Sequence, residues 1–305
     1  AAHSWHHSMM RPMRSAFLAP TFWLVKVMQA CVKAPMPMYT KFSTLAAALA
    51  AAKLRIPVLH VEAGNRLGTL DNPEEINRKL TDHCSTLLFC ATEDARKKLE
   101  AEGLGSRTHC VGNIMYDSFL HFASKPWENP RILALDGSPV TVPESFYYMT
   151  CHRQENTYSD EPLTAILAAM DQLGAKTVYP VHPRNRERAE RVCREHGFGN
   201  ILLTQPVGYS DSVHLTQHAQ KIVTDSGGLQ CEAFYAGVQC VFVLDYVVWP
   251  ETMVENRNQL AKADTGDILK KLAAEQRVDT SYQPFGDGHA AERICDVIRD
   301  WAANR

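Results

Sequence analysis

The sequence predicts an α/β protein made of two Rossmann-like domains that face each other across a cleft. Short β-branched or apolar segments alternate with helical segments along the chain, which is the pattern of parallel sheets. Polar loops follow the predicted strand ends, where ligands bind in sheets of this kind. The length of 305 residues is sufficient for two domains, each with a core of its own.

The composition disfavours several classes of protein. The chain is 45% hydrophobic and 22% charged, as in soluble globular proteins, and its formal net charge of -2 gives no field that attracts nucleic acid or an acidic membrane. No apolar run is long enough to span a bilayer. The nine cysteines form no CxxC pair, which favours reduced thiols over disulfides or a zinc site. We therefore expect a cytoplasmic protein that needs no metal.

The start of the chain differs from the rest. Residues 1–61 contain no Asp, Glu or Gly, although the whole chain has 34 acidic residues and 16 glycines. Residues 16–32 could be an apolar helix or the hydrophobic part of a signal or transit segment. We interpret residues 1–42 as an anomalous segment that is foreign to the rest of the chain, arising from a wrong start or an out-of-frame stretch.

Residues 43–135 are predicted to form a partial first Rossmann-like domain. Its expected elements are a helix over 43–53, strands over 56–61, 86–91 and 108–111, and a helix over 92–102. A polar loop, Glu62-Ala63-Gly64-Asn65-Arg66, follows the first of these strands. It therefore stands where loops of a parallel sheet carry ligand contacts.

A further helix of this domain should begin at Pro73, with Asn72 as its cap. Glu74 and Arg78 lie four residues apart in it, so they share one face. This spacing fits an ordinary surface ion pair as well as a functional site.

Residues 136–288 are predicted to form the second domain, after a Pro-rich linker over 125–145, and a last helix should cover 289–305. The expected strands are 146–150, 177–181, 201–203, 221–223 and 241–244, and the expected helices are 162–173, 186–196, 213–218 and 232–237.

Three polar loops of this second domain follow strand ends and can therefore converge on one crevice. They contain His152-Arg153, His182-Pro183-Arg184-Asn185 and Ser226-Gly227-Gly228. Cationic side chains and N–H donors in such a place suit a diphosphate.

The turn over Thr224–Glu232 joins a buried strand to a helix through two adjacent glycines and a hydroxyl. Glycines allow backbone to approach a ligand closely, and N–H groups at a helix N-terminus attract anions. Glu232, one turn into the helix, could accept hydrogen bonds from a sugar diol. The same stretch is equally compatible with a structural corner that binds nothing.

Two known nucleotide-binding motifs are absent from the sequence, which disfavours two classes of protein. No GxGxxG is followed by an acid about 20 residues later, and no GxxxxGK[ST] is present, so a nicotinamide cofactor and an NTPase are disfavoured. Two carboxylates, Glu62 and Glu74, opposite a phosphate site would suit acid/base chemistry on a sugar.

Eight motifs occur in a fixed order from about Ser43 onward. They are His60-Val61-Glu62-Ala63-Gly64, Pro73-Glu74-Glu75-Ile76-Asn77-Arg78, Val111-Gly112-Asn113, His152-Arg153-Gln154-Glu155-Asn156, Tyr179-Pro180-Val181-His182-Pro183, Thr224 to Glu232, Trp249-Pro250-Glu251 and Pro284-Phe285-Gly286-Asp287-Gly288. Together they resemble the UDP-N-acetylglucosamine 2-epimerase family, its non-hydrolysing type in particular.

The resemblance implies a GT-B-like fold, usually a homodimer, that needs neither nicotinamide nor a catalytic metal. The implied reaction converts UDP-GlcNAc to UDP-ManNAc through anti elimination of UDP to 2-acetamidoglucal, followed by re-addition on the other face. Carried onto this chain, Glu62 and Glu74 match the acid/base carboxylates, and Arg78 and His152 match residues that position the diphosphate and the sugar. Further matches are the phosphate loop Ser226, Gly227 and Gly228, and Glu232 as the acid that holds the ribose.

The chain departs from the family at three places. The family's opening Gly-Thr-Arg-Pro-Glu loop is absent, and Tyr39-Thr40-Lys41 stands where Gly-Asp-Thr is expected, so Thr40 replaces a carboxylate. Val247-Val248 replaces a Thr-Glu pair. These departures leave open a non-catalytic UDP-binding remnant, and the sequence does not separate an epimerase from a hydrolysing variant that releases UDP and ManNAc. A glycosyltransferase of the same fold is disfavoured by the paired carboxylates and the lack of an acceptor-site signature.

Overall fold

The computed structural model describes residues 42–69, 72–128, 130–275 and 281–304. The anomalous segment over 1–42, with Thr40, therefore lies outside the described residues except for its last position. The chain divides into two compact units. Unit 1 runs to Asp117 and resumes at Gln283, and unit 2 is Ser118–Tyr282. No helix in the described part of the chain is long and apolar enough to cross a membrane.

Unit 1 contains a parallel three-stranded sheet in the order β1-β2-β3, built from β1 (Leu59–Ala63), β2 (Leu87–Cys90) and β3 (Thr108–Cys110). Its helices are α3 (Phe42–Lys53), α4 (Pro73–Cys84), α5 (Glu93–Ala101), the short η1 (Gly105–Arg107) and α13 (Ala290–Ala303). Helix α6 (Ile114–Ala123) begins in unit 1 and ends in unit 2.

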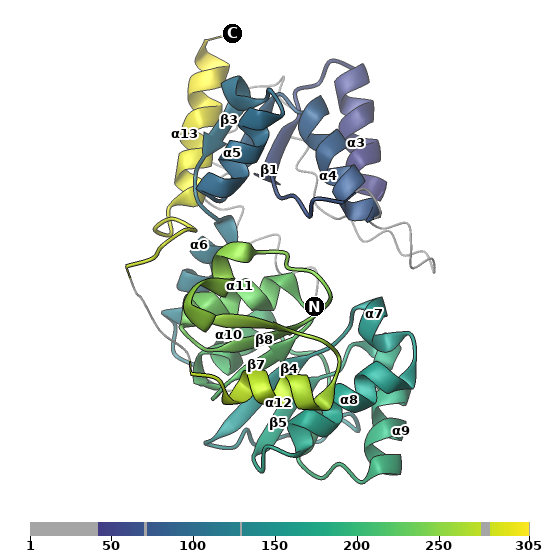
Figure 1. Ribbon diagram of the computed structural model, residues 1–305. Coiled ribbons are helices and arrows are strands. Elements are labelled where there is room, and N and C mark those ends of the chain that lie inside the picture. Colours follow the sequence, from purple (N-terminus) through teal and green to yellow (C-terminus); the bar gives the residue numbers. More distant parts are fainter. Residues whose placement is uncertain (1–41, 70–71, 129, 276–280, 305) are drawn as a thin grey trace. The chain divides into compact units, whose positions relative to one another are not determined.

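Side chains of β2 alternate between two small cores, as expected for a strand with helices on both faces. Leu88 and Cys90 pack with residues of α5, whereas Leu87 and Phe89 pack with residues of α13. Figure 1 shows α5 and α13 beside this sheet. The sequence prediction of a C-terminal helix corresponds to α13, which supplies one of these two cores.

Local capping explains where two helices of unit 1 begin. The Asn72 side chain accepts a hydrogen bond of 2.9 Å from the Glu74 N–H at the start of α4, with Pro73 in the first turn. The Thr92 hydroxyl accepts one of 3.2 Å from the Ala95 N–H at the start of α5. The predicted start of α4 is therefore confirmed.

Unit 2 contains a parallel six-stranded sheet in the order β6-β5-β4-β7-β8-β9, the familiar Rossmann order. The strands are β4 (Phe146–Thr150), β5 (Lys176–Pro180), β6 (Ile201–Thr204), β7 (Ile222–Thr224), β8 (Cys240–Val243) and β9 (Asn258–Ala261). The helices are α7 (Gln154–Thr157), α8 (Asp160–Asp171), η2 (Pro183–Asn185), α9 (Arg186–His196), α10 (Tyr209–His218), α11 (Gly227–Ala236), η3 (Pro250–Asn256) and α12 (Thr265–Ala273).

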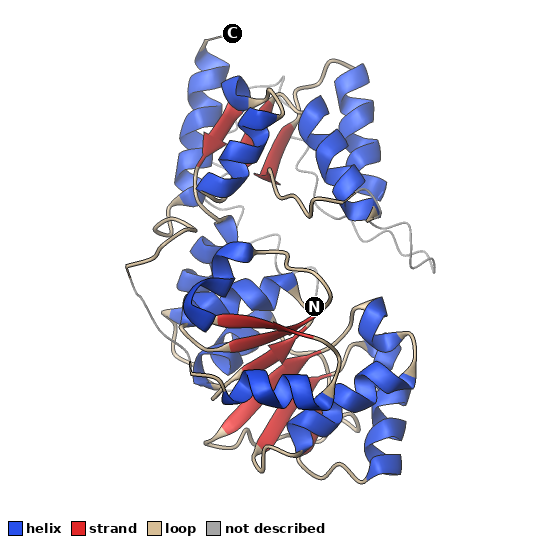
Figure 2. Ribbon diagram, viewed as in Figure 1, coloured by secondary structure: helices blue, strands red, loops and turns tan. Residues whose placement is uncertain are grey.

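Helices cover both faces of this sheet, as Figure 2 shows. Residues of α8, α9 and α12 pack on one face around Met149 and Tyr179, and residues of α10 and α11 pack on the other around Phe146 and Tyr148. Because both faces are buried, several of the strands, such as β4 and β8, read as nearly continuous apolar runs. The predicted α/β class with a parallel sheet in each half is confirmed.

Most element boundaries differ from the prediction by a few residues, and two of these differences affect the candidate site. Strand β1 begins at Leu59 and not at residue 56, because Pro57 has no N–H to donate to a neighbouring strand. The strand also ends at Ala63 and not at residue 61, so Glu62 lies within the strand and not in the loop after it. Helix α11 begins at Gly227 and not near Glu232, because Ser226 caps it at that point. Strand β9 and helices α6, α7 and α12 were not predicted.

Candidate functional site

Glu62 occupies a bulge near the end of β1. The pairing of β1 with β2 shifts register between Val61 and Ala63, and Glu62 has a φ of 65°. This left-handed conformation is unfavourable for a residue with a side chain, and strain of this kind clusters at functional sites. Burial raises the pKa of the Glu62 carboxyl, while His60 and Arg78 act in the opposite direction. Glu62 therefore holds a proton more readily than an exposed glutamate does.

Glu74 and Arg78 share a face of α4, as their spacing predicts. The Arg78 Nη2 atom lies 3.4 Å from the Glu74 Oε2 atom, and the side chains of Arg78 and Glu74 are 25% and 16% exposed. Because Arg78 also acts on the pKa of Glu62, the guanidinium interacts with both carboxylates. Unit 1 thus brings together the three residues that the sequence singled out in it.

A buried aspartate on α4 fixes the loop that follows Glu62. Asp82 is fully buried, and its Oδ1 atom lies 2.5 Å from the His60 Nδ1 atom. Its Oδ2 atom accepts a hydrogen bond of 3.1 Å from the Gly64 N–H and lies 2.8 Å from the Arg66 Nη1 atom. Burial alone would raise the pKa of Asp82, but His60 and Arg66 outweigh it, so that the pKa is lowered. The sequence analysis did not find this role for Asp82.

Arg66 connects this group to Glu102, the residue that follows α5. Its guanidinium donates two hydrogen bonds to the Glu102 carboxylate, of 2.7 Å from Nε and 2.8 Å from Nη2. Such a two-pronged pair has a defined geometry and holds the arginine in place. The loop after β1 therefore contacts both α4 and the C-terminal end of α5.

In unit 2, the candidate site lies where the strand order reverses, between β4 and β7. The Asp225 carboxylate, directly after β7, is buried and accepts hydrogen bonds from the backbone N–H groups of His152 and Arg153, at 2.9 and 2.8 Å. The His152 Nδ1 atom lies 3.2 Å from its Oδ1 atom. Burial alone would raise the pKa of Asp225, but these hydrogen bonds lower it. An ionised aspartate thus ties the loop after β4 to the loop after β7.

The loop after β5 lies next to this point. The ring of His182 stacks on that of His152, with centroids 6.4 Å apart and an interplanar angle of 21°. Burial lowers the pKa of His182, and Arg184 and His152 lower it further. The Arg153 Nη1 atom donates a hydrogen bond of 3.3 Å to the Tyr246 hydroxyl after β8. The predicted convergence of His152, Arg153 and His182 is therefore seen at one edge of the sheet.

The N-terminus of α11 completes this edge. The Ser226 hydroxyl accepts a hydrogen bond of 3.4 Å from the Leu229 N–H, and Gly227 follows as the first helical residue. A Cβ atom on Gly227 would lie 3.4 Å from Val248 Cγ1, which shows how closely the loop after β8 packs against this turn. The N–H groups of a first helical turn, here of Gly227 and Gly228, have no carbonyl partner within the helix and favour an anion.

Glu232 lies farther along α11 and is only 7% exposed. Burial raises the pKa of its carboxyl to about 7, although a hydrogen bond with the Tyr209 side chain, at the start of α10, opposes the rise. The same surroundings raise the pKa of the Tyr209 hydroxyl. The sequence singled out Glu232 but gave no sign of Tyr209, because their contact joins two separate helices.

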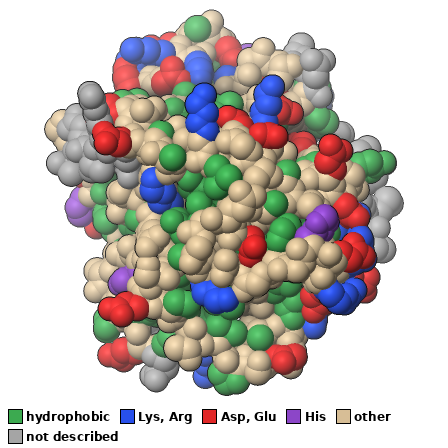
Figure 3. Space-filling model, turned by 60° about the horizontal axis from the view of Figure 1, so that its bottom comes forward, with side chains coloured by type: hydrophobic (Ala, Val, Ile, Leu, Met, Phe, Trp, Pro, Cys, Tyr) green, Lys and Arg blue, Asp and Glu red, His purple; other side chains and the backbone are tan. Residues whose placement is uncertain are grey.

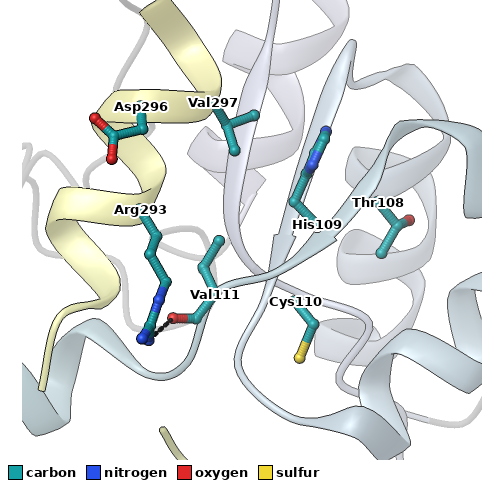
Figure 4. A pocket seen from close by; sticks show the side chains of 7 residues that line it. All are labelled: Thr108, His109, Cys110, Val111, Arg293, Asp296 and Val297. Atoms are coloured by element: carbon teal, nitrogen blue, oxygen red, sulfur yellow. Dashed lines mark hydrogen bonds between the residues drawn. The ribbon is translucent and has the colours of Figure 1, made fainter. Parts of the chain in front are cut away.

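A shallow hollow of about 460 Å³ in unit 1 lies along β3 and α13, between His109, Val111 and Arg293 (Figure 4). None of the predicted site residues lines it. On the face drawn in Figure 3, acidic and basic side chains are interspersed.

Comparison with protein families finds one match that covers most of the chain. The family model described as UDP-N-acetylglucosamine 2-epimerase matches residues 41–299. A protein of Methanococcus maripaludis, described as a UDP-N-acetylglucosamine 2-epimerase homolog, is 38% identical over 262 residues, which cover 85% of this chain and 73% of its own. The UDP-2,3-diacetamido-2,3-dideoxy-D-glucuronate 2-epimerase of Pseudomonas aeruginosa is 36% identical over 264 residues, which cover 84% of this chain and 72% of its own.

Solved structures agree with these matches. The UDP-GlcNAc 2-epimerase of Methanocaldococcus jannaschii, in complex with UDP-GlcNAc and UDP, is 30% identical with a TM-score of 0.69, over 84% of this chain and 73% of its own. The enzyme of Neisseria meningitidis bound to UDP-GlcNAc is 25% identical with a TM-score of 0.70, over 85% of this chain and 74% of its own. These likenesses confirm the GT-B-like fold class that the sequence predicts.

Proposed function

Because the chain belongs to the UDP-N-acetylglucosamine 2-epimerase family, we propose that it inverts C2 of UDP-GlcNAc to give UDP-ManNAc. The observation that carries this proposal is the backbone conformation and the surroundings of Glu62. A carboxyl is held in a strained bulge, where burial raises its pKa, and interacts with Arg78, which also pairs with Glu74. This arrangement suits a group that takes up and returns a proton, because burial raises its pKa above that of a free glutamate.

The chemistry explains the need for two carboxylates. The proton on C2 of the sugar is weakly acidic, so its removal requires the departure of a well-stabilised leaving group. Elimination of UDP gives 2-acetamidoglucal, and re-addition of UDP with protonation on the other face gives the epimer. In this scheme Glu62 and Glu74 transfer the protons, while Arg78 and His152 position the sugar and the diphosphate.

We assign nucleotide binding to unit 2. The first-turn N–H groups of α11, capped by Ser226, suit the diphosphate, and Arg153 and His182 supply donors at the same edge. Asp225 engages the Nδ1 atom of His152, so the Nε2 atom is the ring nitrogen left for a ligand. Glu232 would accept hydrogen bonds from the ribose. A homodimer remains a prediction from the family resemblance, and a cytoplasmic location remains a prediction from the composition and the cysteines.

Incubation with UDP-GlcNAc in deuterated water tests the reaction. We expect UDP-ManNAc with deuterium at C2, detected by NMR, because the proton removed from C2 exchanges with solvent before it is returned. Glu62→Gln should abolish the exchange, whereas Glu292→Gln on α13, whose side chain is 78% exposed, should leave it unchanged. Full exchange by Glu62→Gln would contradict the role of that carboxyl.

The same experiment separates the alternatives. Free UDP and ManNAc as products would indicate the hydrolysing reaction. UDP binding without exchange would indicate a non-catalytic remnant and would end the enzyme proposal. The similarity to the Pseudomonas enzyme makes UDP-2,3-diacetamido-2,3-dideoxy-D-glucuronate a second candidate substrate. Faster turnover of that sugar than of UDP-GlcNAc would change the assigned substrate but not the reaction type.

Calorimetry with UDP tests the assignment of Glu232. At pH 8, where the Glu232 carboxyl is mostly charged, we expect Glu232→Ala to weaken binding by about 1–3 kcal/mol, because hydrogen bonds to a charged group are lost. Glu161→Ala is the matched control, since Glu161 is an exposed residue in the first turn of α8. Equal affinity of the Glu232 variant and the unmodified chain would remove Glu232 from the site.

A further inference from the structure

Two cysteines lie side by side on neighbouring strands of unit 1. Cys90 ends β2 and Cys110 ends β3, and the two residues are paired in the parallel register. Residues paired in this way point to the same face of a sheet, and neighbouring strands are about 4.8 Å apart. Cys90 is buried in the core beneath α5, whereas Cys110 is exposed. One thiol is therefore accessible to solvent and its neighbour is not.

The two thiols contact each other. The Cys90 Sγ atom lies 3.6 Å from the carbonyl oxygen of His109, the residue before Cys110, so its side chain points towards β3. A hydrogen bond with Cys90 lowers the pKa of Cys110 to about 7, and the Gly112 N–H and Arg96 contribute in the same direction. The same contact, together with burial, raises the pKa of Cys90. The accessible thiol is thus also the more acidic one.

We propose that Cys110 and Cys90 form a peroxide-reactive thiol pair that closes to a disulfide. The Cys110 thiolate attacks one oxygen of hydrogen peroxide, which gives a sulfenic acid and releases hydroxide. The Cys90 sulfur then attacks the Cys110 sulfur, the S–S bond forms, and the sulfenic oxygen leaves as water once protonated. In sum, two thiols and one peroxide give one disulfide and two waters.

The spacing of the strands permits this bond. Disulfides join residues whose Cα atoms are about 4.4–6.8 Å apart, a range that includes the separation of neighbouring strands. Cys110 is the last residue of β3, so closing the bond moves the end of this strand and not its middle. A disulfide here needs a local adjustment and no large rearrangement.

The register connects this pair to the proposed catalytic carboxyl. Cys90 pairs with Cys110 on one side and with Ala63 on the other, and Ala63 directly follows Glu62. Drawing Cys90 towards Cys110 changes the pairing next to the bulge that holds Glu62. We therefore expect oxidation to lower epimerase turnover. This consequence rests on the proposed function, whereas formation of the disulfide does not.

Peptide mass spectrometry of the full chain tests the pair directly. After treatment with hydrogen peroxide, trypsin should release residues 80–96 joined to residues 108–131, and dithiothreitol should separate them. Cys84→Ser serves as the background, because Cys84 shares a tryptic peptide with Cys90. The rate should rise about tenfold from pH 6 to pH 8, following the thiolate fraction of Cys110.

Single variants separate the two roles. Cys90→Ala should leave a sulfenic acid on Cys110 that dimedone traps, and Cys110→Ser should leave Cys90 reduced. Oxidation of Cys193 or Cys295 as fast as that of Cys110, or conversion of Cys110 to sulfinic acid without a disulfide, would overturn the proposal. Deuterium exchange into UDP-GlcNAc, compared before and after dithiothreitol, then measures the effect on turnover. If no form of the protein exchanges deuterium, the masses still decide the fate of the thiols.

Discussion

Replacing Glu232 with glutamine isolates the contribution that the titration of this buried carboxyl on α11 makes to the free energy of unfolding. The side chain is 7% exposed, and burial raises its pKa from 4.5 to about 7 despite the hydrogen bond with Tyr209. Glutamine has a similar shape and hydrogen-bonding reach but no titratable proton. The variant should therefore differ from the unmodified chain mainly in how its stability depends on pH.

The sign follows from proton binding in the two states. Between pH 4.5 and about 7 the unfolded chain has released the proton of Glu232 while the folded chain retains it, so the free energy of unfolding falls as pH rises. The contribution of Glu232 is fully present below pH 4.5 and is lost once pH exceeds about 7. At about 1.4 kcal/mol per pKa unit, the loss amounts to about 3 kcal/mol. The substitution Glu232→Gln removes this pH-dependent contribution.

Urea unfolding of the full chain at pH 5 and pH 8 measures this contribution. Groups other than Glu232 titrate alike in both proteins, so their effects cancel when the pH dependence of the variant is subtracted from that of the unmodified chain. Between pH 5 and pH 8, the unmodified chain should lose more stability than Glu232→Gln does, and the difference should be most of the 3 kcal/mol. Glu161→Gln, at an exposed position on α8, should behave like the unmodified chain. Equal losses in all three proteins would refute the reasoning.

Three further substitutions test local geometry. Gly64→Ala should lower the free energy of unfolding by about 1–3 kcal/mol, because φ is +84° and the new Cβ atom would lie 2.6 Å from the Ala95 carbonyl oxygen. Gly103→Ala, with a φ of +77° and no atom within 4 Å, should cost only about 1 kcal/mol in the same urea experiment. Tyr209→Phe removes a hydrogen bond that lowers the pKa of Glu232, so the NMR titration midpoint of that carboxyl should move to higher pH, and an unchanged midpoint would contradict the contact.

Local sequence signals predicted much of the fold. Asn72 and Pro73 marked the start of α4, and the apolar runs of unit 2 lie on strands with helices on both faces. The alternation of strands and helices predicted parallel sheets, since each crossover returns the chain in the same direction. Strand β9 was missed, because its sequence, Asn258 to Ala261, contains two amides and little apolar character.

The details of the candidate site depend on contacts that no local pattern shows. The bulge at Glu62 is a matter of backbone torsion within an otherwise ordinary strand sequence. Asp82 lies on a helix of mostly polar residues, and its partner His60 is 22 residues earlier in the chain. Tyr209 and Glu232 meet because α10 and α11 pack on the same face of the unit 2 sheet. Each of these features depends on the folded structure and leaves no local signal in the sequence.

Both candidate sites use the same construction. In unit 1, Asp82 accepts a hydrogen bond from a backbone N–H of the loop after β1 and contacts the Nδ1 atom of His60. In unit 2, Asp225 does the same for the loop after β4 and for His152. In both cases the contacts with histidine and loop outweigh burial and lower the pKa, so the aspartate stays charged at neutral pH. A charged, buried aspartate holds each loop in one arrangement before any ligand arrives, which reduces the ordering that binding must otherwise impose. The positions of Glu62 and His152 therefore depend on two residues that need not touch the substrate.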